Sequence, residues 1–460
     1  MYSKVKLGLC PIGKFVFSHE DAKVYKAKLE KKLSEMGINF VGIDTVVQDG
    51  IIRGYEDIDP AVEFLRSQRI DCLFIPHCNF GTESAAGMIA KKLGKPVLLW
   101  GPRDHAPLED GTRLRDTLCG MFASSKVLVK LGVPFTYIEN CEIEDDAFLH
   151  VLDKFIRAAN VVKRLKGAKI GIIGNRIDFF WSTIIDESEL LRTFGIEILP
   201  MDLARCIRLT KEKVAKNITA YQNEAKKLGQ ILNLSMMPKH SLVHVLAIRD
   251  VMYEFAMDNN LSALAVESFM TVVEELEACI SYAQAAVSDL GVPCVCESDI
   301  HGAISAMIAE AADLNSSSSF FADLTIRHPE NENGLLLWHD AFPLSLKAPD
   351  CAGSLGTHWI LPNFQRGMCH WKLKDGDITI VRFDGDGGRY RLLTEECSTI
   401  PGPFTQNTYV WVEIDNWKKF EQKVIEGPYI HHTACIYGKY KEVLKEACKY
   451  IGGLKFDPVE

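Results

Sequence analysis

The stretch "DCLFIPHCNFGTESAAGMIAKKLGKPVLLWG" (residues 71–101) decides the fold of the first part of the chain. It holds two short, almost continuous apolar runs, "DCLFIPH" and "KPVLLWG", on either side of the helical pattern "TESAAGMIAKKLG". Strands of this kind that alternate with helices are typical of a parallel sheet covered by helices. The stretch therefore predicts a strand, a helix and a second, parallel strand.

The same alternation extends outward over residues 1–165. "KVKLGLCPIG" and "NFVGIDTVV" have the composition of further strands, and "EDAKVYKAKLEKKLSEMG" is a helical pattern that ends at Gly37. A second unit of the same kind begins at "GAKIGIIGNRIDFFWST" and continues with the strand patterns "FGIEILPMD", "SALAVESF" and "VPCVCESD". We therefore expect an N-terminal α/β domain over residues 1–165 and a central one over residues 166–328.

The central domain contains a weak nucleotide-binding signal. Gly171 and Gly174 stand where a strand runs into a loop, but the full GxGxxG pattern is absent. That pattern supplies the tight turn and the close approach of the backbone to a pyrophosphate. A dinucleotide site is therefore disfavoured.

The pattern changes after about residue 330. "DITIVRFDGDGGRYRLLTEECSTI" is a strand, a turn and a strand, and "NTYVWVEI" and "YIHHTACIYG" resemble further strands. A helical pattern, "YKEVLKEACKYIG", is expected to close the chain. We predict a β-rich, barrel-like domain over residues 329–460, which gives two Rossmann-like parallel-sheet domains followed by a β-rich one.

Composition limits the class of protein. The 460 residues are 47% hydrophobic and 25% charged, which are ordinary values for a globular protein of two or three domains. The net charge of −9 argues against nucleic acid as a partner. No run of roughly eighteen apolar residues suggests a membrane span, and no signal peptide is recognisable. We therefore expect a cytoplasmic protein whose 14 cysteines are reduced thiols.

Polar side chains at predicted strand ends are the candidates for chemistry. Glu297 ends the strand of "VPCVCESDIHGA", and Asp323 follows the aromatic run of "SSFFADLTIRH". His339 ends "LLLWH", and His431 and His432 stand side by side in "GPYIHHTACIYG". Ligands in open parallel sheets bind beyond the carboxyl ends of strands, which favours Glu297 as a site residue.

Each candidate also has a structural explanation. Glu297 could interact with the dipole of the next helix, Asp323 could form a turn, and His339 could be a core histidine with satisfied hydrogen bonds. Because neighbours in a strand face opposite sides, only one residue of the pair His431–His432 is expected to face a shared site. Taken together, oxygen and nitrogen ligands of this kind suit Mn²⁺, Co²⁺ or Mg²⁺ better than a thiolate zinc site does.

The runs "CESDIHGAISAMI", "FFADLTI", "LLLWHDAFP" and "GPYIHHTACIYG" resemble, in this order, the C-terminal half of the L-fucose and L-arabinose isomerase superfamily. "IPHCNFGTESAAG", "WGPRD" and "RDTLCG" fit its fucose-isomerase-like branch more loosely. The resemblance implies a metal-dependent aldose–ketose isomerase, usually with Mn²⁺, that acts through a cis-enediol. It also implies a homo-oligomer, a trimer or hexamer, with active sites at subunit interfaces.

Carried onto this sequence, the resemblance assigns roles to single residues. Glu297 and Asp323 are the expected acid–base pair and metal ligands, and His432 is the ligand histidine. His339 corresponds to a further ligand of the arabinose branch, whereas the fucose branch uses three ligands. His431 stands where the fucose branch tends to have Asn, so it is expected to contact the substrate.

The distal end of the sugar needs further contacts. The family often has an arginine in the first strand–helix loop, but "CPIGKFVF" offers Lys14 instead. Other candidates are His77, Asn79, Arg103 and Arg113, although for each of them the sequence favours a surface loop residue over a sugar contact. An anionic substrate, such as one with the sulfonate of sulfoquinovose, would need Arg or Lys from this set, whereas a neutral deoxy-sugar would need an apolar contact.

An aromatic side chain could also stack on a sugar ring. Trp411 is the candidate, although aromatic residues in β-rich domains usually belong to the core. The substrate class stays open among hexoses, deoxyhexoses, sulfo-sugars and pentoses. Two other functions remain possible at this point: a sugar-binding or sensory protein without catalysis, and a metal-dependent aldolase or epimerase.

Overall fold

The computed structural model describes residues 4–268, 270–358 and 366–459. The chain forms two compact units. The N-terminal unit contains the residues up to Lys163 together with Glu442–Ile451, and the C-terminal unit contains Arg164–Lys441 and the residues from Gly452 onward. The division at 1–165, 166–328 and 329–460 that the sequence suggests stays a prediction.

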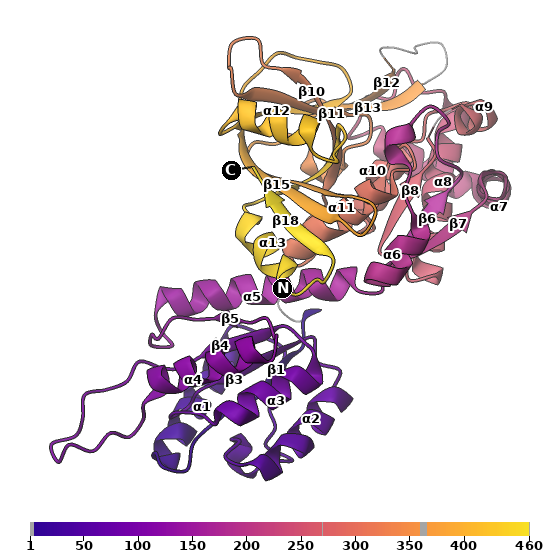
Figure 1. The fold of residues 1–460 in the computed structure, drawn as a ribbon. Coiled ribbons are helices and arrows are strands. Elements are labelled where there is room, and N and C mark those ends of the chain that lie inside the picture. The colour runs from indigo at the N-terminus through magenta and orange to yellow at the C-terminus, as the bar shows by residue number, and fades with distance from the viewer. Residues whose placement is uncertain (1–3, 269, 359–365, 460) are drawn as a thin grey trace. The chain divides into compact units, whose positions relative to one another are not determined.

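The N-terminal unit is built on a five-stranded parallel sheet with strand order β2-β1-β3-β4-β5. Its strands are β1 (Leu7–Leu9), β2 (Phe40–Val41), β3 (Cys72–Pro76), β4 (Val97–Trp100) and β5 (Thr136–Tyr137). Its helices, which flank the sheet in Figure 1, are α1 (His19–Glu35), α2 (Ile58–Ser67), α3 (Glu83–Leu93), α4 (Thr117–Lys130), most of α5 (Asp146–Leu165) and α13 (Lys441–Cys448), with short 3₁₀ turns at η2 (Gln48–Gly50) and η3 (Tyr55–Asp57).

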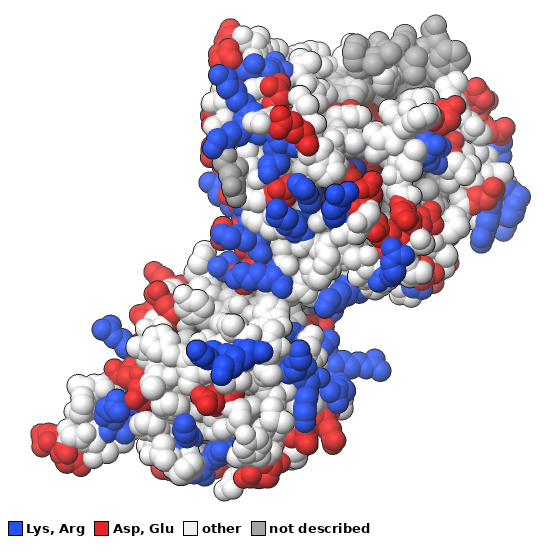
Figure 2. Space-filling model, in the orientation of Figure 1, with Lys and Arg blue, Asp and Glu red and all other residues white. Residues whose placement is uncertain are grey.

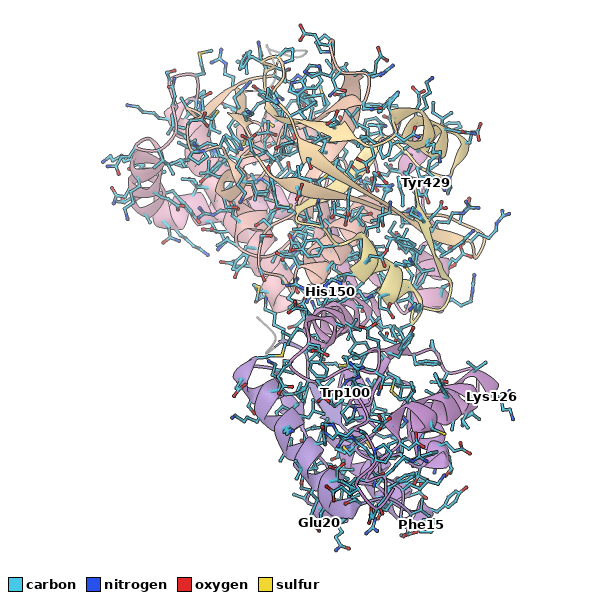
Figure 3. The ribbon with its side chains drawn as sticks, turned by 90° about the vertical axis from the view of Figure 1, so that its left-hand side faces the viewer. Phe15, Glu20, Trp100, Lys126, His150 and Tyr429 are labelled. Carbon is cyan, nitrogen blue, oxygen red and sulfur yellow. The ribbon has the colours of Figure 1, made fainter. Side chains whose placement is uncertain are left out.

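The opening stretch of the sequence folds as predicted. Strands β3 and β4 are buried along their whole length and pair in parallel, with α3 between them in the chain. Helix α3 ends at Gly94, whose φ of 61° lies in the left-handed region that glycine adopts without strain. Figure 3 shows Trp100 inside the unit and Phe15 at its outer edge, and these side chains are 1% and 74% exposed.

The C-terminal unit begins with a four-stranded parallel sheet of order β7-β6-β8-β9. Its strands are β6 (Lys169–Ile173), β7 (Glu197–Met201), β8 (Ala263–Val266) and β9 (Cys294–Val295). The helices of this unit are α6 (Glu187–Phe194), α7 (Leu203–Leu228), α8 (Lys239–Asp258), α9 (Thr271–Leu276), α10 (Ser281–Asp289), α11 (Ile300–Ala312) and α12 (Trp417–Glu426), with 3₁₀ turns at η4 (Trp181–Thr183) and η5 (Leu344–Leu346).

A closed six-stranded barrel forms the rest of the C-terminal unit. Its strands are β10 (Phe320–Arg327), β11 (Gly334–His339), β14 (Asp377–Asp384), β15 (Tyr390–Thr399), β16 (Thr408–Ile414) and β17 (His432–Tyr437). They follow the order β16-β11-β10-β17-β14-β15, and pairing of β15 with β16 closes the ring. Three further strands pair outside this ring: β13 (Arg366–Lys372) pairs with β16, β12 (Ser354–Thr357) pairs with β13, and β18 (Leu454–Pro458) pairs with β15. The predicted fold class is confirmed.

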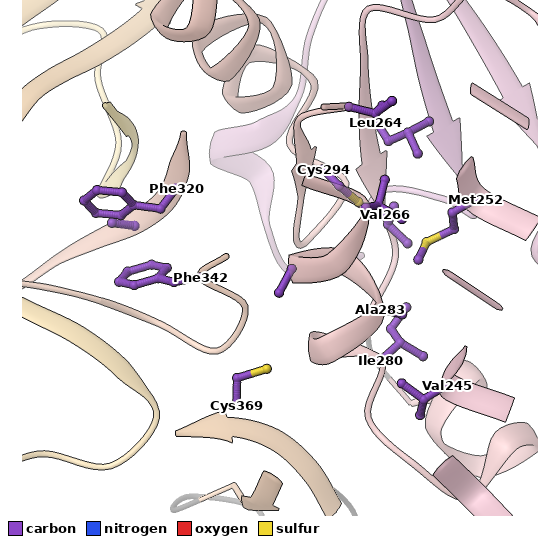
Figure 4. Packing of buried hydrophobic residues seen from close by; sticks show 14 of the residues in the cluster. Val245, Met252, Leu264, Val266, Ile280, Ala283, Cys294, Phe320, Phe342 and Cys369 are labelled. Atoms are coloured by element: carbon purple, nitrogen blue, oxygen red, sulfur yellow. The ribbon is translucent and has the colours of Figure 1, made fainter. Parts of the chain in front are cut away.

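The four-stranded sheet and the barrel share one hydrophobic core. Val266 and Cys294 from the sheet belong to the same buried cluster as Phe320 and Phe342 from the barrel (Figure 4). Helix α11 is buried along its whole length and contacts β8 of the sheet as well as β14 and β17 of the barrel. Each fully buried Phe contributes about 1.5–3 kcal/mol through the hydrophobic effect. This core therefore holds both layers rigidly around α11.

Two properties of the described residues concern partners. Figure 2 shows basic and acidic side chains mixed over the face in view. Among the helices that the structure describes, none combines the length and the apolar character needed to cross a membrane.

Candidate active site

Four side chains from separate elements of the C-terminal unit lie together. Glu297 follows β9, Asp323 belongs to β10, His339 ends β11 and His432 begins β17. Nε2 of His432 lies 3.0 Å from Oε2 of Glu297 and 3.6 Å from Oδ1 of Asp323. Nε2 of His339 lies 3.9 Å from the same oxygen of Asp323. The structure therefore brings together the two acids and two histidines that the sequence singled out.

The barrel register explains why Asp323 and His432 meet. Strands β10 and β17 are antiparallel neighbours, and Asp323 stands directly opposite His432. Directly opposed residues of an antiparallel pair project from the same face of the sheet. On the other side of β10, the register puts Trp338 of β11 opposite Asp323. His339, the last residue of β11, still places its Nε2 3.9 Å from Oδ1 of Asp323.

Glu297 reaches this place through a strained turn. Glu297 and Ser298 have φ values of 61° and 55°, in the left-handed region that residues other than glycine rarely adopt. Such residues cost about 1–3 kcal/mol each and persist only where their surroundings hold them. Ser298 is held by its backbone N–H, which donates to Val266 O, and by its hydroxyl, which donates to Asn175 O at 2.8 Å. Backbone strain of this kind is typical of functional sites.

Three buried atoms of the cluster have no hydrogen-bond partner in the described part of the chain. They are Nε2 of His432, Nε2 of His339 and Oδ1 of Asp323; Nε2 of His432 lies 3.0 Å from Oε2 of Glu297, but without the geometry of a hydrogen bond. A buried polar atom without a partner costs about 1–3 kcal/mol, so three that face one another call for a bound group.

The donor set of the cluster indicates which group fits. One candidate set consists of Glu297, His339 and His432, and another of Asp323, His431 and His432; within each set the ligand atoms lie within 4.8 Å of one another. Carboxylate oxygen and imidazole nitrogen suit Mn²⁺, Co²⁺ or Mg²⁺ in the way expected from the sequence. The residues present therefore fit a divalent metal ion.

Carboxylates set the charge of both buried histidines. Burial opposes a charged ring, but the carboxylates of Asp299 and Glu297 raise the pKa of His432 to about 9. Burial likewise opposes charge on His339, whereas Asp323 and Asp340 raise its pKa to about 10. Without a cation, the cluster therefore favours protonated imidazoles at neutral pH, and a metal ion would replace those protons.

His431 lies at the edge of the cluster. Its side chain is 46% exposed, and its Nε2 lies 4.0 Å from Oδ1 of Asp323. Its ring centroid is 4.2 Å from that of His432. Strand β17 begins only at His432, so the alternation of faces along a strand does not apply to this pair. Both histidines therefore approach Asp323, and His431 does so from the exposed side.

Several residues of the site were not identified from the sequence. Phe180, in the loop after β6, lies 6.1 Å from His432 between ring centroids, and Phe321 lies 5.0 Å from it. Nδ1 of His432 lies 3.0 Å from Oδ2 of Asp299, and Nδ1 of His339 lies 2.8 Å from Oδ1 of Asp340. Asp299 caps helix α11, and the signal in the sequence that could have identified it is a second acid two positions after Glu297.

Two of the expected sugar contacts are buried in the N-terminal unit. His77 bonds through Nε2 to the hydroxyl of Ser124 at 2.8 Å, and burial lowers its pKa to about 4. Asn79 accepts the backbone N–H of Lys14 at 2.9 Å and donates to Ser18 O at 3.2 Å. In this structure Asn79 therefore holds the loop after β1 in shape.

The basic candidates of the same unit are more accessible. Lys14 places its ammonium 4.3 Å from the ring centroid of Phe80. Arg103 is exposed, and Arg113 is exposed and pairs with Asp116 at 2.9 Å. Lys14 is half-buried and the two arginines are exposed, so all three are more accessible to an anion than His77 and Asn79 are.

Trp411 is a core residue in this structure. It is 1% exposed, packs with Leu336 and Tyr409, and donates its indole N–H to Pro403 O at 2.8 Å. It offers no exposed face for a sugar to stack on, so the structural explanation of this residue holds.

Comparison with known proteins identifies related chains. Residues 8–166 match the family model of the fucose/sulfoquinovose isomerase N-terminal domain. A sulfoquinovose isomerase from Priestia aryabhattai is 26% identical over 448 residues, which cover 95% of this chain and 95% of that protein. One from Alkalicoccus urumqiensis is 26% identical over 359 residues, 76% of this chain and 78% of that protein. One from Clostridium sp. (strain MSTE9) is 24% identical over 363 residues, 77% of each.

Proposed function

Because the chain belongs to the fucose isomerase-like superfamily and is an aldose–ketose isomerase, we propose that it converts sulfoquinovose, a sulfo-sugar, to its ketose at the cluster described above. The observation that carries the proposal is the convergence of Glu297, Asp323, His339 and His432 around buried atoms without partners among the described residues. The matched sulfoquinovose isomerases support the substrate class. They also count against a sugar-binding protein without catalysis.

The family is typically metal-dependent, and the donor set fits a divalent ion. Glu297, Asp323 and His432 would hold it, with His339 as a fourth ligand. When bound, the ion would act as a Lewis acid and stabilise the negative charge that develops on the two sugar oxygens. We take Mn²⁺ as the physiological ion, with Co²⁺ and Mg²⁺ as alternatives.

The two carboxylates perform the proton transfer in this proposal. Isomerisation removes a proton from C2 of the aldose while O1 gains one, which gives a cis-enediol; C1 then gains a proton while O2 loses one. Glu297 and Asp323 are partly exposed at the cluster, with side chains 13% and 19% accessible, so a sugar can reach them. A positioned carboxylate contributes about 10²–10⁴-fold through such acid–base catalysis.

The substrate's sulfonate needs a cation. Guanidinium and ammonium groups are the side chains that bind sulfonate oxygens through charge-assisted hydrogen bonds. Lys14, Arg103 and Arg113 remain the candidates, within a homo-oligomer whose subunits share active sites. The trimeric or hexameric state and the cytoplasmic location remain predictions.

The experiment is an isomerisation assay in D₂O. Chelator-treated protein with and without Mn²⁺ is incubated with sulfoquinovose, D-glucose, L-fucose and L-arabinose, and the products are followed by NMR. We expect a ketose from sulfoquinovose, only with metal, with deuterium at C1. Deuterium at C2 of an epimeric aldose, or cleavage of the carbon chain, would indicate an epimerase or an aldolase instead.

A variant pair tests the site. Glu297→Gln should abolish turnover and weaken Mn²⁺ binding, because it removes a negative ligand and a base. Glu421→Gln, on the exposed face of α12, makes the same change away from the site and should leave both unchanged. Near-normal kcat in Glu297→Gln would refute the mechanism.

A further inference from the structure

A buried carboxylate lies directly behind His432. Oδ2 of Asp299 is 3.0 Å from Nδ1 of His432 and 2.5 Å from Nη1 of Arg382. Its Oδ1 accepts the backbone N–H of Gly302 at 2.8 Å. Asp299 and Arg382 are both 0% exposed, so these contacts occur without competition from water.

Its surroundings keep Asp299 an acceptor. The Arg382 guanidinium faces it, and a guanidinium stays charged in proteins. Asp299 is also the N-cap of α11, where the helix dipole favours negative charge. An ionised carboxylate accepts hydrogen bonds and cannot donate them. The hydrogen bond between Asp299 and His432 is therefore one that Nδ1–H of the ring donates.

A second pair of contacts fixes Asp299 in place. Arg382 also donates to Asp384 at 2.8 Å, and Asp384 lies 3.1 Å from Nδ1 of His301. Asp299 and His301 lie on α11 or at its cap, whereas Arg382 and Asp384 lie on β14. The helix and the strand are thus joined at two points two residues apart, by the ion pair of Arg382 with Asp299 and by the contact of Asp384 with His301, which leaves Asp299 little freedom to move.

We propose that Asp299 is a positioning residue, which holds a proton on Nδ1 of His432, so that Nε2 is the ring nitrogen that faces Glu297 and Asp323 and is left to bind a cation. Carboxylates that accept a hydrogen bond from a ligand histidine fix its tautomer and strengthen it as a donor. The inference rests on the proposed metal site but assigns a role that the reaction itself does not require.

His339 provides an internal contrast. Its Nδ1 meets both the carboxylate of Asp340, at 2.8 Å, and the backbone N–H of the same residue, at 2.9 Å. The carboxylate can only accept, so it favours a proton on Nδ1, whereas the backbone N–H can only donate, so it favours Nδ1 without a proton. The tautomer of His339 is therefore not fixed by its neighbours, whereas that of His432 is.

The first test needs no change to Asp299. Full-length protein labelled with ¹⁵N-histidine is saturated with Zn²⁺, a diamagnetic ion that imidazole binds, and the ring nitrogens are observed by NMR. The signal of His432, assigned by its absence in His432→Ala, should show a protonated Nδ1 and a metal-bound Nε2. A protonated Nε2 would overturn the proposal.

The second test compares two buried carboxylates. Asp299→Asn should weaken Mn²⁺ binding, measured by EPR of the free ion, about 10- to 100-fold. Asp384→Asn, in the same network but without contact to His432, should weaken it far less. Equal binding by Asp299→Asn and wild type, or equal losses in the two variants, would overturn the proposal.

A failure of the proposed function and a failure of the proposed role of Asp299 would give different results. Wild-type protein that neither binds Mn²⁺ nor isomerises a sugar would refute the proposed function. Wild-type protein that does both, beside an Asp299→Asn variant with unchanged affinity, would refute only the role of Asp299. If Asp299→Asn does not fold, the NMR measurement of the tautomer of His432 in the wild-type protein decides whether the role of Asp299 is correct.

Discussion

Replacing Arg382 by methionine should strongly destabilise the C-terminal unit. Arg382 is fully buried between Asp299 and Asp384, so Arg382→Met keeps an apolar stem but leaves two buried carboxylates without their cation. Removing one partner of a buried ion pair costs about 3–5 kcal/mol. Unfolding entropy is about 2.1 cal/mol/K per residue, or roughly 0.6 kcal/mol/K for the approximately 290 residues of this unit. The expected loss in Tm is therefore about 5–8 °C.

Differential scanning calorimetry at neutral pH, with a chelator present so that metal binding does not contribute, measures this loss. Arg391→Met is the matched control on β15, because its side chain is 41% exposed and 3.6 Å from Asp457. Exposed pairs contribute about 0–1 kcal/mol, so this control should lose about 2 °C or less. Adding Asp384→Asn to Arg382→Met should recover part of the stability by removing one unpaired charge. Equal shifts in the two arginine variants would refute the argument.

Three further perturbations test other parts of the molecule. Burial raises the pKa of Glu310 from 4.5 to about 7, so the free energy of unfolding should fall as pH rises through this range, by up to about 3 kcal/mol. Glu310→Gln should remove this pH dependence, which urea titrations at pH 5 and pH 8 would measure. Gly120→Ala should destabilise the N-terminal unit by about 1–3 kcal/mol or more, because the added Cβ would lie 1.7 Å from Phe80 O; hydrogen exchange in α4 would show it. His432→Ala should abolish Mn²⁺ binding, whereas His431→Ala should mainly raise KM; calorimetry and kinetics would reveal the reverse order if the assignment of the two is exchanged.

Local sequence patterns were sufficient to predict those helices and strands whose limits depend on residues close by in the chain. The stretch 71–101 folds as strand, helix and strand because apolar runs and a glycine stop specify each element without reference to the rest of the chain. The hairpin of β14 and β15 also follows from its turn composition. Helix α7 begins at Leu203, where Asp202 caps it by accepting the backbone N–H of Arg205 at 3.0 Å.

The end of the chain was predicted wrongly. The helix at Lys441–Cys448 was expected to close the chain, but β18 (Leu454–Pro458) follows it and pairs in parallel with β15. Only two of the five residues of β18 are buried, so no continuous apolar run marks the strand in the sequence. Its pairing depends on β15, which lies about sixty positions earlier.

The site was predictable only in part. Glu297, Asp323, His339 and His432 were found because they end or begin predicted strands and match family motifs. Their convergence required the order of the barrel strands, which no local pattern contains. Arg382 was missed because its partner Asp299 lies 83 positions earlier in the chain. A charged residue inside the apolar run "TIVRFD" was the one local sign of it.

The path of the chain between the two units has a consequence for biosynthesis. Residues Glu442–Ile451 belong to the N-terminal unit, although the strands before and after them in the chain, β17 of the barrel and β18 paired with β15, belong to the C-terminal unit. There Glu446 accepts a hydrogen bond from the hydroxyl of Thr136, and Tyr450 donates to Val97 O at 3.1 Å. A ribosome makes the five strands of that unit long before it makes these ten residues. The part of the protein that is synthesised first is therefore completed among the last, and the unfinished unit must stay soluble while the barrel is made.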